Sequence, residues 1–327
     1  MGHRRTPHPA VHGARALAAT AVLLAGGAIG APFAFVPNQD SSSISVIDLG
    51  ERRVTVDIAV GERPAGVAVS RNGHDVFISD PETGRIYRLD GRSHEVTMEG
   101  VGGQGPLGIA LSPDGSRVYV TDWFANELQV LDAQTLKPLA RVGVGRAPSG
   151  VAVAADGSRI FVADRDDNRL SVIDATTLAV VGHVATGQRP FGIGIEPDGA
   201  RLYVANVASN DLSVIDARTL QPIATIAVGS TPYAVAVSPD GTRIYVTNQH
   251  ANSVSLIDGA RLEVVAERAV GEFPEGIVAD PDGERVYVAS WFSNELLILD
   301  SHSLEVTDRI PTGEGPRAFG IFVAGGS

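Results

Sequence analysis

The sequence predicts an all-β protein, a seven-bladed β-propeller, and three observations lead to this prediction. An apolar run that ends in aspartate recurs every 42 residues without an insertion, as from Asp48 to Asp90. Each unit holds four short runs of β-prone residues separated by turn residues, and no run has helical periodicity. The partial units at the two ends of the pattern add up to one whole unit. We therefore expect seven blades of four antiparallel strands each.

The composition agrees with short strands and tight turns. The 327 residues include 37 glycines and 19 prolines, and only 20% are charged. This length suffices for one large domain or two ordinary ones, each with a buried core. The chain has no cysteine, which excludes disulfides, thiol nucleophiles and thiolate metal sites.

Residues 1–30 have the layout of a secretory signal peptide. The first fifteen residues carry three arginines and no acid, and residues 16–30 are uncharged and mostly apolar. The alternative is a membrane anchor, because the uncharged run continues to Pro37 and approaches the about 20 residues that a spanning helix needs. Cleavage would remove the three arginines from 26 basic residues and leave 23 against 38 acids, a net charge of -15. We expect an exported, acidic protein.

Three residue types mark every unit at the same 42-residue step. The aspartates are Asp48, Asp90, Asp132, Asp174, Asp216, Asp258 and Asp300. The prolines are Pro64, Pro106, Pro148, Pro190, Pro232, Pro274 and Pro316. The glycines are Gly61, Gly103, Gly145, Gly187, Gly229, Gly271 and Gly313.

One unit illustrates the predicted elements in order. An alternating run leads to a Pro-Asp-Gly turn at Pro239, and a second β-rich run ends at Asn248 before a polar loop. A third run ends at Asp258, and the fourth follows a short turn. The strands of this unit are expected at residues 233–238, 243–248, 254–258 and 262–270.

The two ends of the pattern predict how the ring closes. Residues 34–38 align with 244–248, the second strand of a unit, and residues 316–323 form a first strand with nothing after it. We expect the C-terminal strand to lie innermost in a blade whose other three strands come from the N-terminal end. Residues 31–327 would then form a single propeller domain without open edges.

Several short motifs recur in the units: Tyr-Val-Thr-Asn at Tyr245, Tyr-Val-Thr-Asp at Tyr119, and Ser-Pro-Asp-Gly turns at Ser112 and Ser238. In these motifs the sequence resembles the YVTN-repeat β-propeller family, and the resemblance extends from about residue 34 to 323. It implies an exported, periplasmic or cell-surface propeller, and one bacterial member of the family is reported to bind single-stranded DNA. The family's repeated residues are structural, so the resemblance implies no catalytic residue.

The repeated aspartates are expected to accept backbone N–H bonds in turns, so function is sought where the repeats differ. Residues beside the repeated prolines, and the related loops Trp123-Phe124 and Trp291-Phe292, fall on the propeller face where ligands usually bind. The candidate ligand-binding residues are Arg63, Trp123, Phe124, Arg189, Phe191, Tyr233, Phe273, Trp291, Phe292 and Arg317. A packing role for the Trp-Phe pairs is the alternative.

Catalytic signals are weak, so we favour a binding module over an enzyme. The histidines are dispersed over the repeat, and no Gly-x-Ser-x-Gly motif is present. The alternative is a small-molecule lyase or lactonase acting in the central channel. Its candidate acid, base and anchor are Glu275, Arg317 and His250, which fall in loops of adjacent blades.

We expect no organic cofactor and only a weak candidate metal site. The Gly-x-Gly-x-x-G sequence at residues 100–105 is interpreted as a loop between blades, because no helix follows it to bind pyrophosphate. Asp164, Asp166 and Asn168 offer oxygen ligands for a structural Ca²⁺, without the glycine and glutamate of an EF-hand loop.

The expected partner is an unidentified small ligand or a protein of the cell envelope, bound by a monomer. Single-stranded nucleic acid is an alternative that the acidic net charge disfavours, unless Arg63, Arg189 and Arg317 form a basic mouth. Membrane association is expected only if the N-terminus stays uncleaved.

Overall fold

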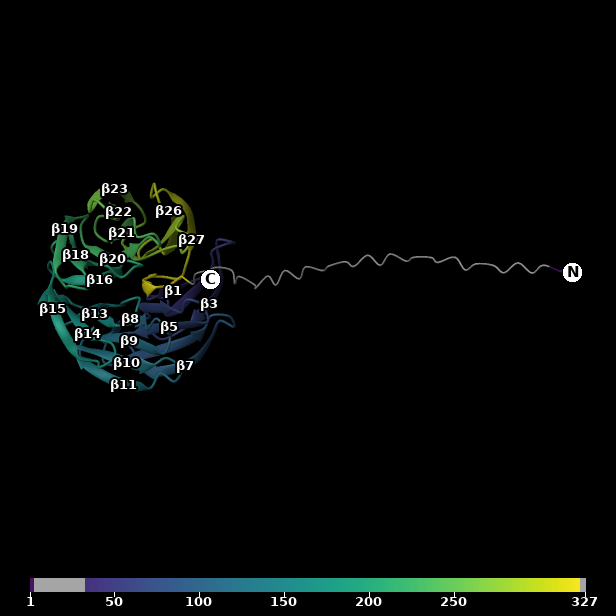
Figure 1. The fold of residues 1–327 in the computed structure, drawn as a ribbon, viewed down its shortest axis with the longest axis horizontal. Helices are drawn as coiled ribbons and strands as arrows, with labels where there is room; N and C mark the ends of the chain where they lie inside the picture. The colour runs from purple at the N-terminus through teal and green to yellow at the C-terminus, as the bar shows by residue number, and fades with distance from the viewer. Residues whose placement is uncertain (3–32, 324–327) are drawn as a thin grey trace. The chain divides into compact units, whose positions relative to one another are not determined.

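The computed structural model describes residues 1–2 and 33–323, and within them the chain forms seven β-sheets arranged as a ring (Figure 1). Five sheets have four antiparallel strands in sequence order, such as β12-β13-β14-β15. The seven-bladed all-β propeller predicted from the 42-residue repeat is therefore confirmed. The predicted signal peptide, residues 1–30, lies outside the described residues apart from Met1 and Gly2.

Each blade contributes strands at four distances from the ring axis. The innermost strands are β4 (Gly66–Val69), β8 (Pro106–Leu111), β12 (Pro148–Val153), β16 (Pro190–Ile195), β20 (Pro232–Val237), β24 (Pro274–Ala279) and β28 (Phe319–Ile321). The second strands are β1 (Phe33–Asn38), β5 (Asp75–Asp80), β9 (Arg117–Asp122), β13 (Arg159–Asp164), β17 (Arg201–Asn206), β21 (Arg243–Asn248) and β25 (Arg285–Ser290).

The third and fourth strands complete the blades. The third strands are β2 (Ser43–Asp48), β6 (Arg85–Asp90), β10 (Glu127–Asp132), β14 (Arg169–Asp174), β18 (Asp211–Asp216), β22 (Ser253–Asp258) and β26 (Glu295–Asp300). The outermost strands are β3 (Arg53–Ala59), β7 (Glu95–Val101), β11 (Pro138–Gly143), β15 (Val180–Ala185), β19 (Pro222–Ala227), β23 (Glu263–Ala269) and β27 (Val306–Pro311). A 3-10 turn, η1 (Arg165–Asp167), lies between β13 and β14. In the described residues, no helix is both long and apolar enough to span a membrane.

The second and third strands are buried on both faces, because each blade packs between two neighbours. All side chains of β9 after Arg117 are buried, whereas the outermost β15 alternates between more and less exposed residues. The innermost strands approach one another so closely that one repeat position carries only glycine or alanine. A Cβ on Gly108 would lie 2.2 Å from the carbonyl oxygen of Ser149 in the next blade. Glycine at this position therefore permits the narrow centre of the ring.

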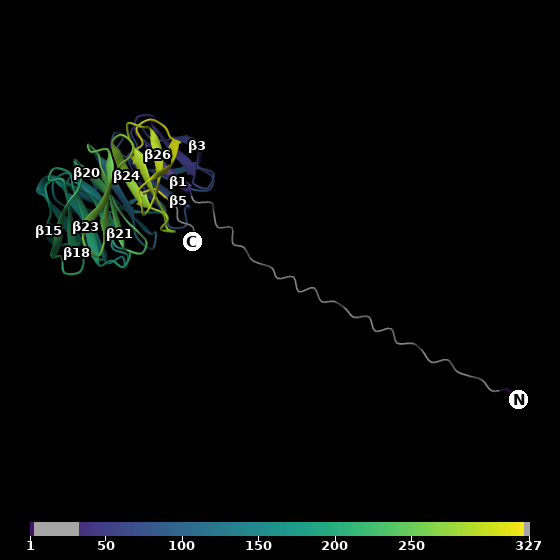
Figure 2. The ribbon, with the colours of Figure 1, turned by 90° about the horizontal axis from the view of Figure 1, so that it is seen from above.

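The C-terminal segment closes the ring as predicted. Its ends pair with β1 through the bridges Asn38–Pro316 and Ala34–Val323, and the N–H of Phe35 donates to the carbonyl oxygen of Phe322 at 2.8 Å. Its middle, β28, also pairs in parallel with β4 of the following blade. Both views place the blade of β1–β3 beside that of β24–β27 (Figure 1 and Figure 2).

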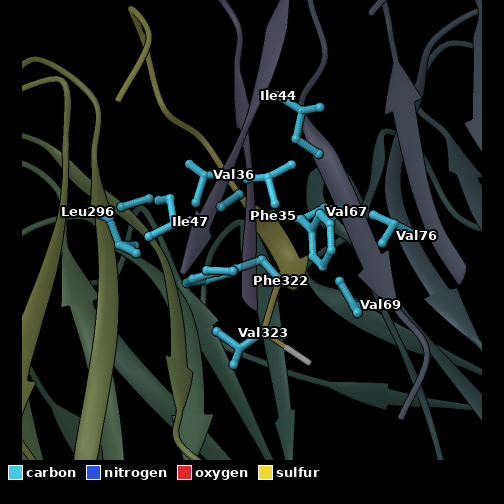
Figure 3. Close-up of a cluster of buried hydrophobic side chains, with 14 of the residues drawn as sticks. Phe35, Val36, Ile44, Ile47, Val67, Val69, Val76, Leu296, Phe322 and Val323 are labelled. Carbon is cyan, nitrogen blue, oxygen red and sulfur yellow. The ribbon is translucent and has the colours of Figure 1, made fainter. Parts of the chain in front are cut away.

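A hydrophobic cluster seals this junction. Figure 3 shows Phe322 and Val323 among buried side chains of β1, β2, β4 and β26, including Phe35 and Leu296. Because the cluster draws on both ends of the described chain, its burial depends on closure of the ring.

Candidate functional site

A depression of about 340 Å³ lies at one end of the ring axis, where the innermost strands of several blades begin. Its lining residues occupy three positions of the repeat: the residue after a second strand, and the residues on either side of the repeated proline. They are Trp123, Arg165, Phe191, Val207, Tyr233, Gln249, Phe273, Glu275, Trp291 and Arg317. Equivalent positions of different blades thus carry different side chains, and these side chains meet at the ring axis.

A repeated asparagine fixes the loop that enters each innermost strand. The side-chain oxygen of Asn252 accepts the backbone N–H of Phe273 at 2.9 Å, and Asn168 holds Arg189 in the same way at 2.8 Å. Phe273 and Arg189 both have a left-handed backbone, with φ of 57° and 56°. This hydrogen bond offsets the strain of a non-glycine residue in that conformation and orients the residue before the proline.

Aromatic rings form the floor of the depression. The ring centroids of Phe191 and Tyr233 lie 4.4 Å apart, and those of Trp123 and Phe191 lie 6.3 Å apart. Phe319, which belongs to the C-terminal segment, packs on Phe191 with ring centroids 5.0 Å apart. Trp123, Phe191 and Tyr233 line the depression and give it an apolar surface.

A buried polar network borders the aromatic floor. The Oε1 atom of Glu275 accepts a hydrogen bond from Gln249 Nε2 at 2.7 Å, and Arg317 Nε lies 3.0 Å from Glu275 Oε2. Arg317 directs its N–H groups elsewhere, to Tyr233 Oη at 2.7 Å and to Gln39 Oε1 at 3.2 Å. Glu275 Oε2 is therefore in ion-pair contact but accepts no hydrogen bond.

Backbone contacts set the position of Glu275. Thr247 Oγ1, on β21, donates to the Glu275 carbonyl oxygen at 2.8 Å and so ties β24 to the neighbouring blade. Glu275 itself is 1% exposed. Its carboxyl group is therefore buried by the packing of neighbouring blades.

Burial determines the protonation behaviour of this network. Desolvation raises the pKa of Glu275 to about 7, although the nearby Arg317 charge acts in the opposite direction. The pKa of Tyr233 is also raised, mainly by burial, so its hydroxyl keeps its proton. The pKa of Arg317 stays above its ordinary value because Tyr233 and Glu275 outweigh its desolvation. Glu275 is thus the group of this network that titrates near neutral pH.

Two arginines stack on the two tryptophans of the chain. The guanidinium carbon of Arg165 lies 5.4 Å from the Trp123 ring centre, and that of Arg317 lies 5.2 Å from the Trp291 ring centre. Both contacts fall within the range of cation–π interactions. Trp291 Nε1 also donates to Asp40 Oδ2 at 3.2 Å. The tryptophan side chains are therefore packed and oriented within the site.

The structure brings together seven of the residues singled out from the sequence. They are Trp123, Phe191, Tyr233, Phe273, Glu275, Trp291 and Arg317. Sequence reasoning missed Arg165, Val207 and Gln249, although a detectable signal existed. Each lies a whole number of 42-residue steps from Trp123 and Trp291, so aligning that one position across the blades would have found them.

The other predicted site residues lie outside this depression. Arg63 forms an ion pair with Asp40 at 3.0 Å, and Phe124 and Phe292 are exposed on the surface. Arg189 lines a separate, polar depression of about 310 Å³ with Arg146 and Gln188. Arg63, Arg189 and Arg317 therefore do not line one common depression.

The candidate catalytic residues converge only in part. Glu275 and Arg317 are in contact, whereas His250 packs against Phe273 with ring centroids 5.4 Å apart. His250 Nδ1 lies 2.8 Å from Thr231 Oγ1. The histidine therefore borders the loop of Phe273 without lining the depression.

The oxygens of the candidate Ca²⁺ site have protein partners. Asp164 is buried and accepts hydrogen bonds from Gly145 N at 2.9 Å and Ser171 Oγ at 2.7 Å. The side-chain oxygen of Asn168 accepts the N–H of Arg189. Among the residues that the structure describes, no three His, Asp or Glu side chains are grouped to hold a metal.

The strands define a seven-bladed propeller with a depression at its axis, and the comparisons with known proteins agree on the propeller fold. The family model described as "Lactonase, 7-bladed beta-propeller" matches residues 61–219, and the "YNCE-like beta-propeller" model matches residues 226–324. Neither description names the YVTN-repeat family. No curated protein matches the chain.

Three solved structures illustrate the similarity in fold. Hydrazine synthase of Kuenenia stuttgartiensis is 25% identical over 78% of this chain and 88% of its own, with a TM-score of 0.71. A functionally unknown protein of Desulfotomaculum acetoxidans DSM 771 is 14% identical over 88% of this chain and 99% of its own, with a TM-score of 0.77. Dihydro-heme d1 dehydrogenase NirN, solved with DHE, is 17% identical over 87% of this chain and 74% of its own, with a TM-score of 0.66.

Proposed function

We propose that this protein is a binding module that takes a small ligand, or one side group of a larger partner, in the depression at the ring axis. One observation carries the proposal: apolar rings and buried polar groups from several blades converge in a single depression of about 340 Å³. Ligand sites of proteins combine an apolar surface with a few well-placed polar groups in this manner. The scaffold repeats while these side chains do not, which fits selection for recognition.

The two tryptophans provide the test, because both line the depression. A metabolite panel is screened by thermal shift, with and without Ca²⁺, and each stabilising compound is then titrated by tryptophan fluorescence. We expect Phe273→Ala to weaken the binding of a positive compound at least about tenfold, because an aromatic wall is lost. Phe124→Ala is the matched control, since Phe124 is exposed and outside the depression. Equal losses in the two variants would contradict the proposed site.

The binding module is proposed to act outside the cytoplasm. This proposal rests on the charge and apolar pattern of residues 1–30. Sequencing of the N-terminus of the protein recovered from its host distinguishes the two alternatives. A mature protein that begins near Ala31 supports export with cleavage, and retention of Arg15 supports a membrane anchor.

A lactonase is the second candidate function, favoured by the match of residues 61–219 to the lactonase propeller model. Glu275 would supply its buried acid–base group. Arg317, a candidate base by sequence, would instead anchor the substrate, because a guanidinium keeps its proton. Hydrolysis of a panel of lactones is measured for the protein and for Glu275→Gln. Activity that falls by at least about a hundredfold in the variant would favour the enzyme over the binding module.

A further inference from the structure

The charged residues that line the depression are two arginines and one glutamate. Arg165 pairs with the neighbouring Asp166 at 2.7 Å, and Arg317 has Glu275 beside it. Both guanidinium groups are largely buried and lie on tryptophan rings. The depression thus presents fixed positive charge beside apolar rings, in a protein whose net charge is -12.

Arg317 has hydrogen-bonding capacity left for a ligand. Its guanidinium has five N–H groups, and three hydrogen bonds to Tyr233 and Gln39 use one group on each nitrogen. One N–H on each terminal nitrogen remains. Paired donors of this kind suit the two oxygens of a carboxylate.

Glu275 competes with such a ligand for the charge of Arg317. The groups that face it are Arg317 from the C-terminal segment, Tyr233 from β20 and Gln249 after β21, and the charge of Asp40 also acts on Arg317. Its Oε2 atom has almost no exposed surface and lies 3.0 Å from Arg317 Nε, so ionisation of Glu275 places a negative charge directly against the guanidinium. Burial already raises the pKa of this carboxyl to about 7.

We infer that the depression selects ligands with a carboxylate attached to an apolar ring, and that protonation of Glu275 switches this binding on. The inference rests on the proposed function, because it names the ligand class and the regulation of the same site. The apolar ring lies on the aromatic floor, and the carboxylate takes the free N–H groups of Arg317. When Glu275 is ionised, it neutralises Arg317 and repels the carboxylate. When Glu275 takes up a proton, the guanidinium charge is left for the ligand.

The test uses three probes of similar size that differ in charge: cyclohexanecarboxylate, cyclohexylmethanol and cyclohexylmethylammonium. They do not absorb where tryptophan does, so Trp123 and Trp291 report their binding. We expect the carboxylate to bind best, and about tenfold more tightly at about pH 6 than at about pH 8, as the protonated fraction of Glu275 changes. The alcohol should bind weakly and equally at both pH values.

Glu275→Gln mimics the protonated side chain and should bind the carboxylate tightly at both pH values, with less than roughly a twofold difference. Glu272→Gln, at an exposed glutamate of the same loop, should keep the pH dependence of the unchanged protein. If the variant at Glu275 does not fold, calorimetry of the unchanged protein in buffers of different ionisation enthalpy measures proton uptake on binding. We expect uptake of up to about one proton near pH 8.

Different failures have different meanings. If the alcohol and the carboxylate bind equally, the inference is overturned. If carboxylate binding shows no pH dependence and no proton uptake, the inference is also overturned. In both cases the depression remains a binding site. Preference for the ammonium probe would overturn it as well. If no probe changes the tryptophan fluorescence and no compound of the metabolite panel binds, the proposed function fails together with the inference.

Discussion

The aspartate at the end of each third strand is a structural residue in all seven blades. The Oδ1 atom of Asp300 accepts the N–H groups of His302 at 3.0 Å and Ser303 at 2.8 Å. The six equivalent aspartates make the same pair of bonds to the residues two and three positions later. The role predicted from the repeat is confirmed, because an Asx turn depends only on local backbone geometry.

Removal of one of these carboxylates should cost little but measurable stability. For Asp300→Ala, we expect the free energy of unfolding in urea to fall by about 1 kcal/mol, because two turn N–H groups lose their acceptor in a solvated loop. Asp300→Asn keeps the Oδ1 acceptor and should lose less than about half of that. Equal losses for alanine and asparagine would show that the turn bonds do not matter.

Glu275 represents the opposite case, a residue whose behaviour comes from tertiary burial. Its pKa in the folded protein, about 7, is above its ordinary value of 4.5, so the folded state binds the proton more tightly. The stabilisation is fully present below the unfolded pKa and is lost as the pH rises through the folded pKa.

The free energy of unfolding should record this loss. The free energy of unfolding of the unchanged protein, measured relative to that of Glu275→Gln, should fall by about 1.4 kcal/mol per pH unit between about pH 4.5 and about pH 7. Chemical unfolding at several pH values measures it for both proteins. If the stability of the unchanged protein relative to the variant stays constant or rises with pH, the raised pKa is contradicted.

At the scale of elements, arginines at the start of the second strands connect neighbouring blades. Arg117, Arg159 and Arg201 each donate from Nη1 to a carbonyl oxygen 58 residues later, at 2.8, 2.8 and 2.7 Å. The same repeat position holds Phe33 in the closing blade, where the ring packs on His94 at 5.6 Å. The sequence predicts the strands to within a residue or so, but these connections between elements are visible only in the structure.

Loss of one such connection should weaken the contact between two blades. Arg159→Met keeps the apolar stem and removes the guanidinium, so we expect the free energy of unfolding to fall by about 1.5 kcal/mol. Arg261→Met, at an exposed arginine, is the control and should change it by less than about 0.5 kcal/mol. Denaturant unfolding of the two variants measures the difference. Equal midpoints of unfolding would show that the hydrogen bond of Arg159 to the neighbouring blade does not contribute to stability.

At the scale of the whole molecule, the ring is closed by non-covalent contacts between the two ends of the described chain. Phe322 is fully buried among residues of β1 and β4, whereas its neighbour Ile321 is exposed. The closure of the ring also brings Arg317 against Glu275 and Tyr233. Ring stability and the candidate site therefore depend on the same segment.

The two neighbouring residues provide a matched test of closure. Phe322→Ala should lower the free energy of unfolding by about 3 to 5 kcal/mol, because a large buried side chain leaves a cavity. Ile321→Ala should change it by less than about 0.5 kcal/mol, because the side chain is already solvated. Thermal unfolding of both variants measures the effect. Similar melting temperatures for the two would argue against closure by this segment.

The sequence by itself determined the number of blades, the strand order and the turn residues. These features repeat because each depends on short-range hydrogen bonds and alternating burial, which every 42-residue unit encodes separately. It also pointed to Trp123, Trp291 and the residues beside the prolines as positions where the blades differ.

Only the tertiary structure decided which of these residues meet. Arg63 and Arg189 do not line the depression with Arg317, while Arg165 and Gln249 do. The charge state of Glu275 is likewise a property of the closed ring. Its desolvation comes from the packing of neighbouring blades, and its partner Arg317 arrives from the end of the chain that completes the circle.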